Sequence, residues 1–275
     1  MIVLVTGCRS GFGLGVAVEA ARRGHTVYAG LRDLSTDAEL RAAAGSLDVR
    51  PIQLDVVDAV QRQAVVDQIV ATHGRIDALV NNAGVALGGP LETIDEDELR
   101  NVLEINVIAP WALCCAVLPT MRAQRSGVIV NVGSVSGLVA MPGLGAYATS
   151  KFALEGMTEA LWHEARAFGV HVELVEPGPF KTDIWGRNRS LSRRALDPDS
   201  PYAPFVAKLE KMVHGIAQDR AEDPAIVNRA IVDLIERPDG RLRHVLGRAA
   251  WIRIGARNWL PEAVYGAIVA RVLSR

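Results

Sequence analysis

Short apolar runs, most of them rich in β-branched residues, alternate along the chain with segments of helical periodicity. The helical segments are expected around residues 16–23, 60–72, 105–125 and 147–168. Alternating strands and helices are typical of right-handed crossover units, which stack into a parallel sheet covered on both faces. The pattern therefore predicts a doubly wound α/β fold, with a parallel sheet of about seven strands and helices on both faces. The predicted strands are 2–6, 26–31, 49–55, 76–81, 127–134, 171–177 and 243–247.

The segment from about 180 to 215 departs from this alternation. Its first part, 180–204, is rich in Arg, Asn, Ser and Pro and shows little periodicity. It directly follows the predicted sixth strand, and open α/β sheets bind ligands beyond the carboxyl ends of their strands. We therefore expect a mobile substrate lid here, in preference to an inert surface loop.

The C-terminal stretch, about 248–275, is basic and amphipathic. From Arg237 to Arg275 eight Arg face only Asp239 and Glu262, a local charge of 8 − 2 = +6. Such a tail could cover the pocket or contact a neighbouring subunit, and this is the interpretation that we favour. The alternative is a peripheral contact with an anionic membrane. A nucleic-acid role is disfavoured because no binding motif accompanies the cations. Its apolar residues are Trp251, Trp259, the row Val264, Ile268 and Val272, and beside it Tyr265, Val269 and Leu273.

Composition narrows the class of protein. The 275 residues carry 30 Lys and Arg against 31 Asp and Glu, a net charge of −1, and 49% are hydrophobic. These values exclude disordered, collagen-like and disulfide-framework proteins and fit a single domain over 1–275. The three cysteines, Cys8, Cys114 and Cys115, cannot all pair and have no zinc spacing, so a reducing, cytoplasmic location is expected.

Neither of the two most apolar stretches of the sequence predicts export or membrane insertion. The opening MIVLVTG has no basic region or cleavage site and is expected to be a buried strand. The apolar stretch Val107–Met121 has 15 residues and two prolines. A spanning helix needs roughly 20 apolar residues. This stretch is therefore predicted to be a core or subunit-contact helix.

A glycine-rich turn follows the first predicted strand and leads into a helix. Glycines let the main chain approach a pyrophosphate closely, and the helix N-terminus offers unpaired N–H groups and partial positive charge. The turn therefore predicts a dinucleotide site. Its expected contacts are Gly7, Arg9, Ser10, Gly11, Phe12 and Gly13.

The turn reads TGxxxGxG, the glycine motif of short-chain dehydrogenases/reductases, and further motifs of that family follow in the same order and spacing. They are Asn81-Asn82-Ala83-Gly84, Asn106, Ser134, Tyr147 with Lys151, and Pro177-Gly178 followed by Thr182. The chain thus resembles this family strongly over residues 1–185. The resemblance implies a Rossmann-type sheet, nicotinamide cofactors and oxidoreductase activity, in an assembly expected to be a homodimer or homotetramer. It also places Asn82, Ala83, Gly84, Pro177, Gly178 and Thr182 around the cofactor.

The end of the second strand bears on the choice of cofactor. A carboxylate there would bind the ribose 2′-OH of NAD, whereas an Arg would accommodate the 2′-phosphate of NADP. The acidic position holds Leu31 and the next is Arg32, with Arg9 as a possible second cation. NADP(H) is therefore favoured over NAD(H), the alternative being that Arg32 is a surface charge paired with Asp33 or Asp37.

Asp55 and Val56 follow the third strand. Asp55 resembles the family residue that contacts the adenine. The alternative for Asp55 is a helix N-cap.

Tyr147 and Lys151 are four residues apart and therefore share one face of a helix. A nearby ammonium favours the phenolate, so we expect Lys151 to lower the pKa of Tyr147 toward neutrality. The phenol would then act as an acid toward a carbonyl and as a base toward an alcohol. In the family's mechanism, which the resemblance implies, Ser134 hydrogen-bonds the substrate oxygen and Lys151 holds the nicotinamide ribose. Asn106 positions a water that relays protons, unless its amide only satisfies local backbone groups.

The stretches YAGLRDLS, GSVSGL and YATSKFALEGMTEAL resemble the 17-beta-hydroxysteroid dehydrogenase and retinol dehydrogenase branch. This implies a small apolar alcohol or carbonyl substrate, steroid-like or retinoid-like. An NAD-dependent alcohol dehydrogenase of the same family and a non-catalytic redox sensor are the alternatives. The expected apolar lining is Leu138, Val139, Met141, Leu144, Phe180 and Trp185, for each of which core packing is the alternative.

Overall fold

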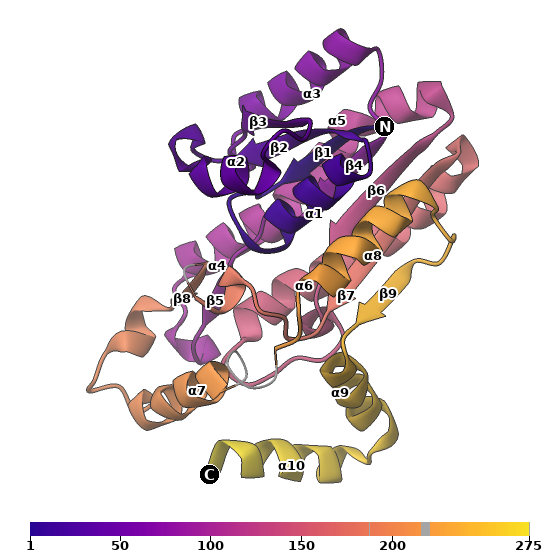
Figure 1. The fold of residues 1–275 in the computed structure, drawn as a ribbon. Coiled ribbons are helices and arrows are strands. Elements are labelled where there is room, and N and C mark those ends of the chain that lie inside the picture. Colours follow the sequence, from indigo (N-terminus) through magenta and orange to yellow (C-terminus); the bar gives the residue numbers. More distant parts are fainter. Residues whose placement is uncertain (187, 216–220, 275) are drawn as a thin grey trace.

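The computed structural model describes residues 1–186, 188–215 and 221–274 and has a parallel sheet at its centre (Figure 1). Within these residues the sheet has seven strands in the order β3-β2-β1-β4-β6-β7-β9. The doubly wound α/β fold is confirmed, with the reversal of strand order between β1 and β4. The strands are β1 (Ile2–Thr6), β2 (Thr26–Leu31), β3 (Val49–Gln53), β4 (Ala78–Asn81), β6 (Gly127–Val132), β7 (Val170–Pro177) and β9 (Arg243–Leu246).

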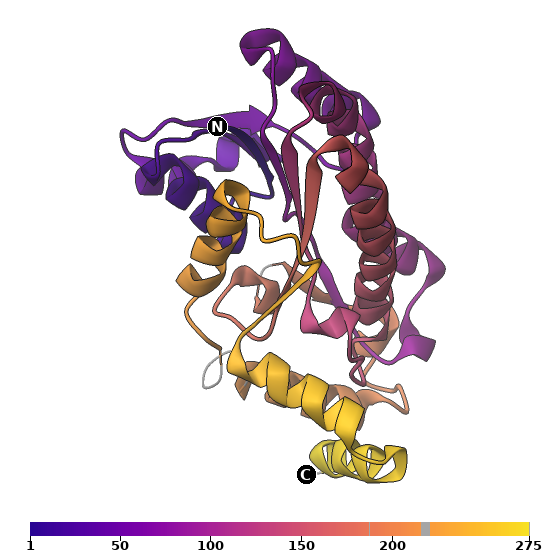
Figure 2. The same ribbon diagram turned by 90° about the vertical axis from the view of Figure 1, so that its right-hand side faces the viewer.

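Helices cover both faces of the sheet (Figures 1 and 2). One apolar cluster joins the sheet to α1, α2 and α8, and another joins its opposite face to α3, α5 and α6. The tail forms two helices, α9 and α10. The helices are α1 (Gly11–Arg22), α2 (Ala38–Ala44), α3 (Ala59–His73), α4 (Glu96–Leu103), α5 (Ala109–Gln124), α6 (Gly145–Ala165), α7 (Ala203–Gly215), α8 (Ala225–Glu236), α9 (Arg248–Trp259) and α10 (Glu262–Ser274).

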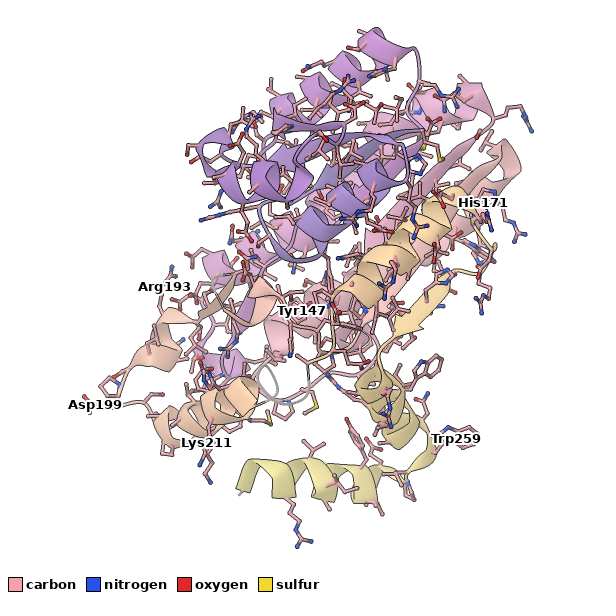
Figure 3. All side chains as sticks on the ribbon, viewed as in Figure 1. Tyr147, His171, Arg193, Asp199, Lys211 and Trp259 are labelled. Atoms are coloured by element: carbon pink, nitrogen blue, oxygen red, sulfur yellow. The ribbon has the colours of Figure 1, made fainter. Side chains whose placement is uncertain are left out.

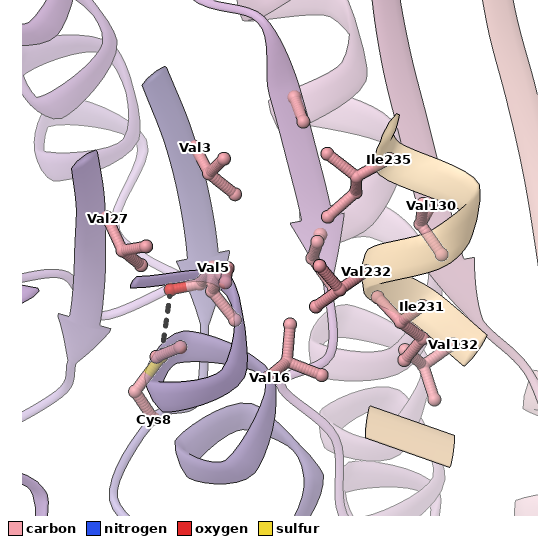
Figure 4. Close-up of a cluster of buried hydrophobic side chains, with 14 of the residues drawn as sticks. Val3, Val5, Cys8, Val16, Val27, Val130, Val132, Ile231, Val232 and Ile235 are labelled. Atoms are coloured by element: carbon pink, nitrogen blue, oxygen red, sulfur yellow. Dashed lines mark hydrogen bonds between the residues drawn. The ribbon is translucent and has the colours of Figure 1, made fainter. Parts of the chain in front are cut away.

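Strand β1 shows why its apolar run forms a buried strand. Successive side chains of a strand point to opposite faces, so Val3 and Val5 join one cluster and Leu4 the other. All three are fully buried. Figure 4 shows Val3 and Val5 in their cluster, with Cys8 donating its Sγ hydrogen to the Val5 carbonyl (3.2 Å). Both faces of the sheet are thus covered by the apolar core, so the space for a ligand lies beyond the ends of the strands.

The predicted helix 105–125 belongs to a longer, bent one. Residues Glu96–Gln124 form α4, a π-helical turn (Glu104–Ile108) and α5 in succession. By length and composition this stretch could cross a membrane. A core helix has the same composition, and the inner face of α5, including Leu113 and Val117, is buried against the sheet. The core-helix prediction therefore agrees with its packing.

The lid segment is more regular than its sequence indicated. It contains α7 and a short strand, β8 (Arg189–Leu191), which pairs in parallel with β5 (Ala86–Gly88). The carboxylate of Glu210 on α7 binds both terminal nitrogens of Arg189, one of them at 2.9 Å. The expectation of an irregular segment was wrong at β8 because a three-residue strand gives little periodicity to detect.

The tail helices pack beside the lid. Helix α10 contacts α7 and α9, and Figure 2 shows both tail helices below the sheet. The two rows expected on α10 differ in burial, because Tyr265 and Val269 are half-buried whereas Val264 and Ile268 are exposed. The side chains of Val272 and Leu273 lie outside the described residues. Trp251 and Trp259 are exposed, and Figure 3 shows Trp259 at the outer side of the molecule.

Candidate active site

The glycine turn joins β1 to the N-terminus of α1. Gly7 has φ +70°, a conformation that favours glycine, and a Cβ there would lie 2.8 Å from Ala83 Cα. A Cβ on Gly13 would lie 2.3 Å from the Gly7 carbonyl oxygen. The turn and helix can therefore approach one another this closely only without side chains at these two positions.

A cavity of about 580 Å³ opens beyond the turn, at the carboxyl ends of the strands. It runs from the turn to Tyr147, which Figure 3 shows near the middle of the molecule. The predicted site residues line it except for Gly13, which serves helix packing, and Asn106. Those that line it are Gly7, Arg9, Ser10, Gly11, Phe12, Arg32, Asp55, Val56, Asn82, Ala83, Gly84, Ser134, Tyr147, Lys151, Pro177, Gly178 and Thr182.

Two guanidinium groups lie at the nucleotide end of this cavity. Arg9 and Arg32 are exposed and line it, and neither forms an ion pair with the residues that the structure describes. The expected alternative was a pair of Arg32 with Asp33 or Asp37. Asp37 instead binds Arg41 at 2.5 Å, and Asp33, which feels the charge of Arg32 without an ion pair, accepts from the Ser35 N–H. The positive charges of both Arg contribute to lowering the pKa of Asp33, after that carboxylate's hydrogen bonds to Ser35.

Asp55 and Asn82 have distinct structural roles. Asp55 accepts a hydrogen bond from the Val57 N–H (3.2 Å), and the N-cap of α3 is Asp58. The N-cap alternative for Asp55 was therefore wrong, by three residues. Asn82 Nδ2 donates to the carbonyl oxygens of Thr6 (2.8 Å) and Gly7 (3.2 Å), which ties the end of β4 to that of β1.

Tyr147, Lys151 and Ser134 meet on one side of the cavity. The Lys151 ammonium lies 5.8 Å from the centroid of the Tyr147 ring and donates to the Val132 carbonyl at 2.8 Å. Ser134 follows β6 and caps the next turn by accepting from the Ser136 N–H (3.1 Å). Ser134 and Tyr147 line the same cavity, and the Ser134 hydroxyl lies close enough to oppose the rise in the pKa of Tyr147. The structure thus places Ser134 beside Tyr147, while the main-chain N–H of Ser136 donates to Ser134 within the turn.

The expected acidification of Tyr147 by Lys151 was wrong for this structure. Burial raises the pKa of Tyr147, and the Ser134 hydrogen bond and the charge of Arg253 only oppose this. Burial also lowers the pKa of Lys151 to about 8. Desolvation of both groups outweighs their mutual attraction. Tyr147 therefore remains a protonated phenol, ready to give its proton to a carbonyl oxygen.

The Asn106 side chain has protein partners for its amide. Its Oδ1 accepts from the Val85 N–H (3.0 Å), and its Nδ2 donates to the Val85 carbonyl (2.9 Å) and to Ser150 Oγ (3.0 Å). This arrangement is the structural alternative considered for Asn106. An amide bound in this way positions the loop after β4 against α6, next to Lys151.

The far end of the cavity is mainly apolar. Met141, Leu144 and Phe180 line it as predicted, but Val139 and Leu138 do not, because Val139 packs into the interior and Leu138 is half-buried elsewhere. The Trp185 side chain lies outside the described residues. Several further lining residues come from the lid segment and the tail, and could not be predicted from the sequence because only the folded chain brings them here. They are Asp183, Ile184, Asn188, Arg189, Met212, Val213, Ala249 and Arg253.

The residues present fit a nicotinamide dinucleotide. The main chain of the glycine turn is open to the cavity, and Arg9 and Arg32 stand where a phosphate would need cations. When bound, the nicotinamide supplies or accepts the hydride. The proton chemistry then falls to Tyr147, which Lys151 and Ser134 adjoin.

Comparison with known proteins identifies the family of the chain. The family model described as short chain dehydrogenase matches residues 1–192. Human 17-beta-hydroxysteroid dehydrogenase type 1 is 36% identical over 253 residues, covering 88% of this chain and 76% of the relative. The 3-ketodihydrosphingosine reductase of Bacteroides thetaiotaomicron is 33% identical over 262 residues, covering 95% and 93%.

A crystal structure of a short-chain dehydrogenase from Streptomyces avermitilis superposes with a TM-score of 0.83 at 34% identity, covering 98% of this chain and 96% of that one. The resemblance expected from the motifs is thereby confirmed. The chain belongs to the short-chain dehydrogenase/reductase family and is an NAD(P)-dependent oxidoreductase that acts on CH–OH groups.

Proposed function

We propose that the protein transfers a hydride between NADP(H) and a ketone or secondary alcohol, or an aldehyde, on a bulky apolar skeleton. The observation that carries the cofactor choice is the pair of guanidinium groups, Arg9 and Arg32, at the nucleotide end of the cavity. A guanidinium fork matches a phosphate, and two cations favour the 2′-phosphate of NADP. The competing group is Asp33, but its carboxylate caps a turn by accepting from the Ser35 N–H (2.9 Å).

The substrate class rests on the apolar end of the cavity. Met141, Leu144, Met212 and Val213 surround the space beyond Tyr147. Apolar walls with few polar groups suit a hydrophobic ligand whose orientation is fixed at the reacting oxygen. The names of the two relatives above, a hydroxysteroid dehydrogenase and a ketodihydrosphingosine reductase, support such a skeleton.

The protonation states of the site suit the reduction of a carbonyl. Ser134 orients the carbonyl oxygen by donating a hydrogen bond, and Tyr147 gives that oxygen its phenolic proton. Lys151, buried behind the phenol, supplies positive charge as the phenolate forms. The raised pKa of Tyr147 makes the phenol a proton donor before the substrate arrives.

The test is a fluorescence titration with NADPH and NADH, combined with NADPH consumption over a panel of steroids, retinoid aldehydes and simple ketones. We expect tighter binding of NADPH, and a loss of about tenfold or more of this preference in Arg32→Ala and Arg9→Ala. Arg22→Ala is the control, because Arg22 is exposed on α1 and binds Glu19. Equal affinities for the two cofactors, unchanged in Arg32→Ala, would refute the proposal.

A further inference from the structure

A guanidinium from the C-terminal helix α9 enters the substrate end of the cavity. Arg253 lines this end together with Tyr147, and its Nη2 donates to the main-chain carbonyl of Val139. Its Nε is buried and has no hydrogen-bond partner. Among the residues that the structure describes, no carboxylate forms an ion pair with it. The site therefore holds a half-buried cation with no counterion among the described residues.

The electrostatics place this charge beside the reacting group. Burial lowers the pKa of Arg253, and the positive charge of Arg253 opposes part of the rise that burial causes in the pKa of Tyr147. A charge removed from water costs free energy unless an opposite charge compensates it. An anion bound next to Tyr147 would provide that compensation.

The other cations of this end are already engaged. Arg189 is held by both carboxylate oxygens of Glu210. Lys151 donates to the Val132 carbonyl and adjoins the phenol. The Nε of Arg189 is unpaired as well, but its charge is balanced by Glu210. Among the described cations of this end, Arg253 is thus the one whose guanidinium has no carboxylate beside it.

We propose that Arg253 binds a carboxylate of the substrate, so that the protein reduces apolar oxo acids to hydroxy acids. The inference rests on the proposed function, because it names the substrate class of that same site. In the reaction NADPH gives a hydride to the ketone carbon and becomes NADP⁺, while Tyr147 gives its proton to the ketone oxygen. The carboxylate is unchanged and only fixes which carbonyl meets the phenol. Arg253 is on this account a specificity-determining residue.

The test uses a set of oxodecanoic acids that carry the ketone at different positions. The rate with each acid is compared with the rate with its methyl ester. We expect the best acid to exceed its ester in kcat/KM by about tenfold or more in the wild type, since a charge-assisted hydrogen bond is lost in the ester. In Arg253→Met this ratio should fall close to one. Arg253→Lys, which retains the charge, should keep part of the preference. Arg257→Met is the matched control, because Arg257 is exposed one turn further along α9.

Several outcomes would overturn the assignment. These are a wild type that prefers the ester, an acid preference that survives in Arg253→Met, or weaker NADPH binding in that variant. An equal loss for acid and ester with a shifted pH profile would instead show that Arg253 acts through Tyr147, and would equally overturn it.

A binding measurement separates this inference from the proposed function. Unreactive decanoate with NADP⁺ should raise the melting temperature of the wild type and not that of Arg253→Met. This difference would support the carboxylate site even if no ketone were reduced. Its absence, in a protein that does reduce ketones with NADPH, would overturn the inference alone.

Discussion

Asn106 donates a hydrogen bond from Nδ2 to Ser150 Oγ (3.0 Å), one residue before Lys151. The same amide makes two hydrogen bonds with the main chain of Val85, in the loop that follows β4 and precedes β5. One side chain in the π-helical turn thus connects the cofactor side of the sheet to the helix that carries the tyrosine and the lysine. Its place in the fold is that of a buried cross-link.

Replacing Asn106 with Ala should therefore reduce stability as well as activity. The Val85 N–H and carbonyl would lose their partner in a buried region, at a cost of about 2–3 kcal/mol in the free energy of unfolding. Urea denaturation measures this change. Asn101→Ala is the control, since Asn101 is exposed on α4. If Asn106→Ala lost activity yet unfolded at the wild-type urea concentration, the amide would act in catalysis and not as a cross-link.

Tyr147→Phe should lower kcat by about a hundredfold or more, because the ring remains and only the transferable proton is removed. NADPH affinity, measured by fluorescence titration, should stay within about twofold of the wild type, since the proton is not a cofactor contact. Tyr202→Phe is the control, because the Tyr202 hydroxyl binds Glu92 (2.7 Å) on the lid side. Undiminished ketone reduction by Tyr147→Phe would contradict the assigned role.

Lys151 should impose an alkaline limit on reduction. Burial lowers its pKa to about 8, so the ammonium charge is present below that pH and lost above it. The kcat/KM for NADPH, which reports groups of the free enzyme, should therefore fall above about pH 8. In Lys151→Arg the guanidinium stays charged, so this limb should move to higher pH at a lower overall rate.

The control for that measurement is Lys211→Arg, on the exposed face of α7. It should retain the wild-type profile. A limb that stayed at the same pH in Lys151→Arg would show that another group is titrating.

The sheet and the cofactor turn could be predicted because their signals are local. The β-branched run at 2–6 and the glycines at 7, 11 and 13 are adjacent in sequence. Within the strand, successive side chains alternate, so the sequence also predicts which face of the sheet each one contacts. Tyr147 and Lys151 were likewise related by one helical turn. Their titration was mispredicted because it depends on burial, which pairwise spacing does not report.

The substrate end could not be predicted for a different reason. Arg253 reaches Val139 across 114 residues of sequence, through a tail helix placed by β9 and the lid. No periodicity within either segment encodes that contact. The pairing of Glu155 with Glu176 is equally invisible, since it depends on how α6 packs against β7.

That buried carboxyl pair makes a stability prediction of its own. Glu176 is fully buried in β7, and burial, together with the charge of Glu155, raises its pKa above the usual 4.5. Arg243 donates to Glu155 Oε2 (3.0 Å) and to the exposed Glu159 (2.8 Å), so it offsets part of the charge. A raised native pKa means that the folded state holds its proton more tightly than the unfolded state.

The stability that this proton provides is present below pH 4.5 and is lost as the pH rises through the raised native pKa of Glu176. The urea midpoint of the wild type should therefore decline as the pH rises from about 5 to 9. Glu176→Gln cannot ionise, so its midpoint should decline less over that range. Glu164→Gln, exposed on α6, should follow the wild type. Parallel curves for the wild type and Glu176→Gln would show that this carboxyl does not hold the extra proton.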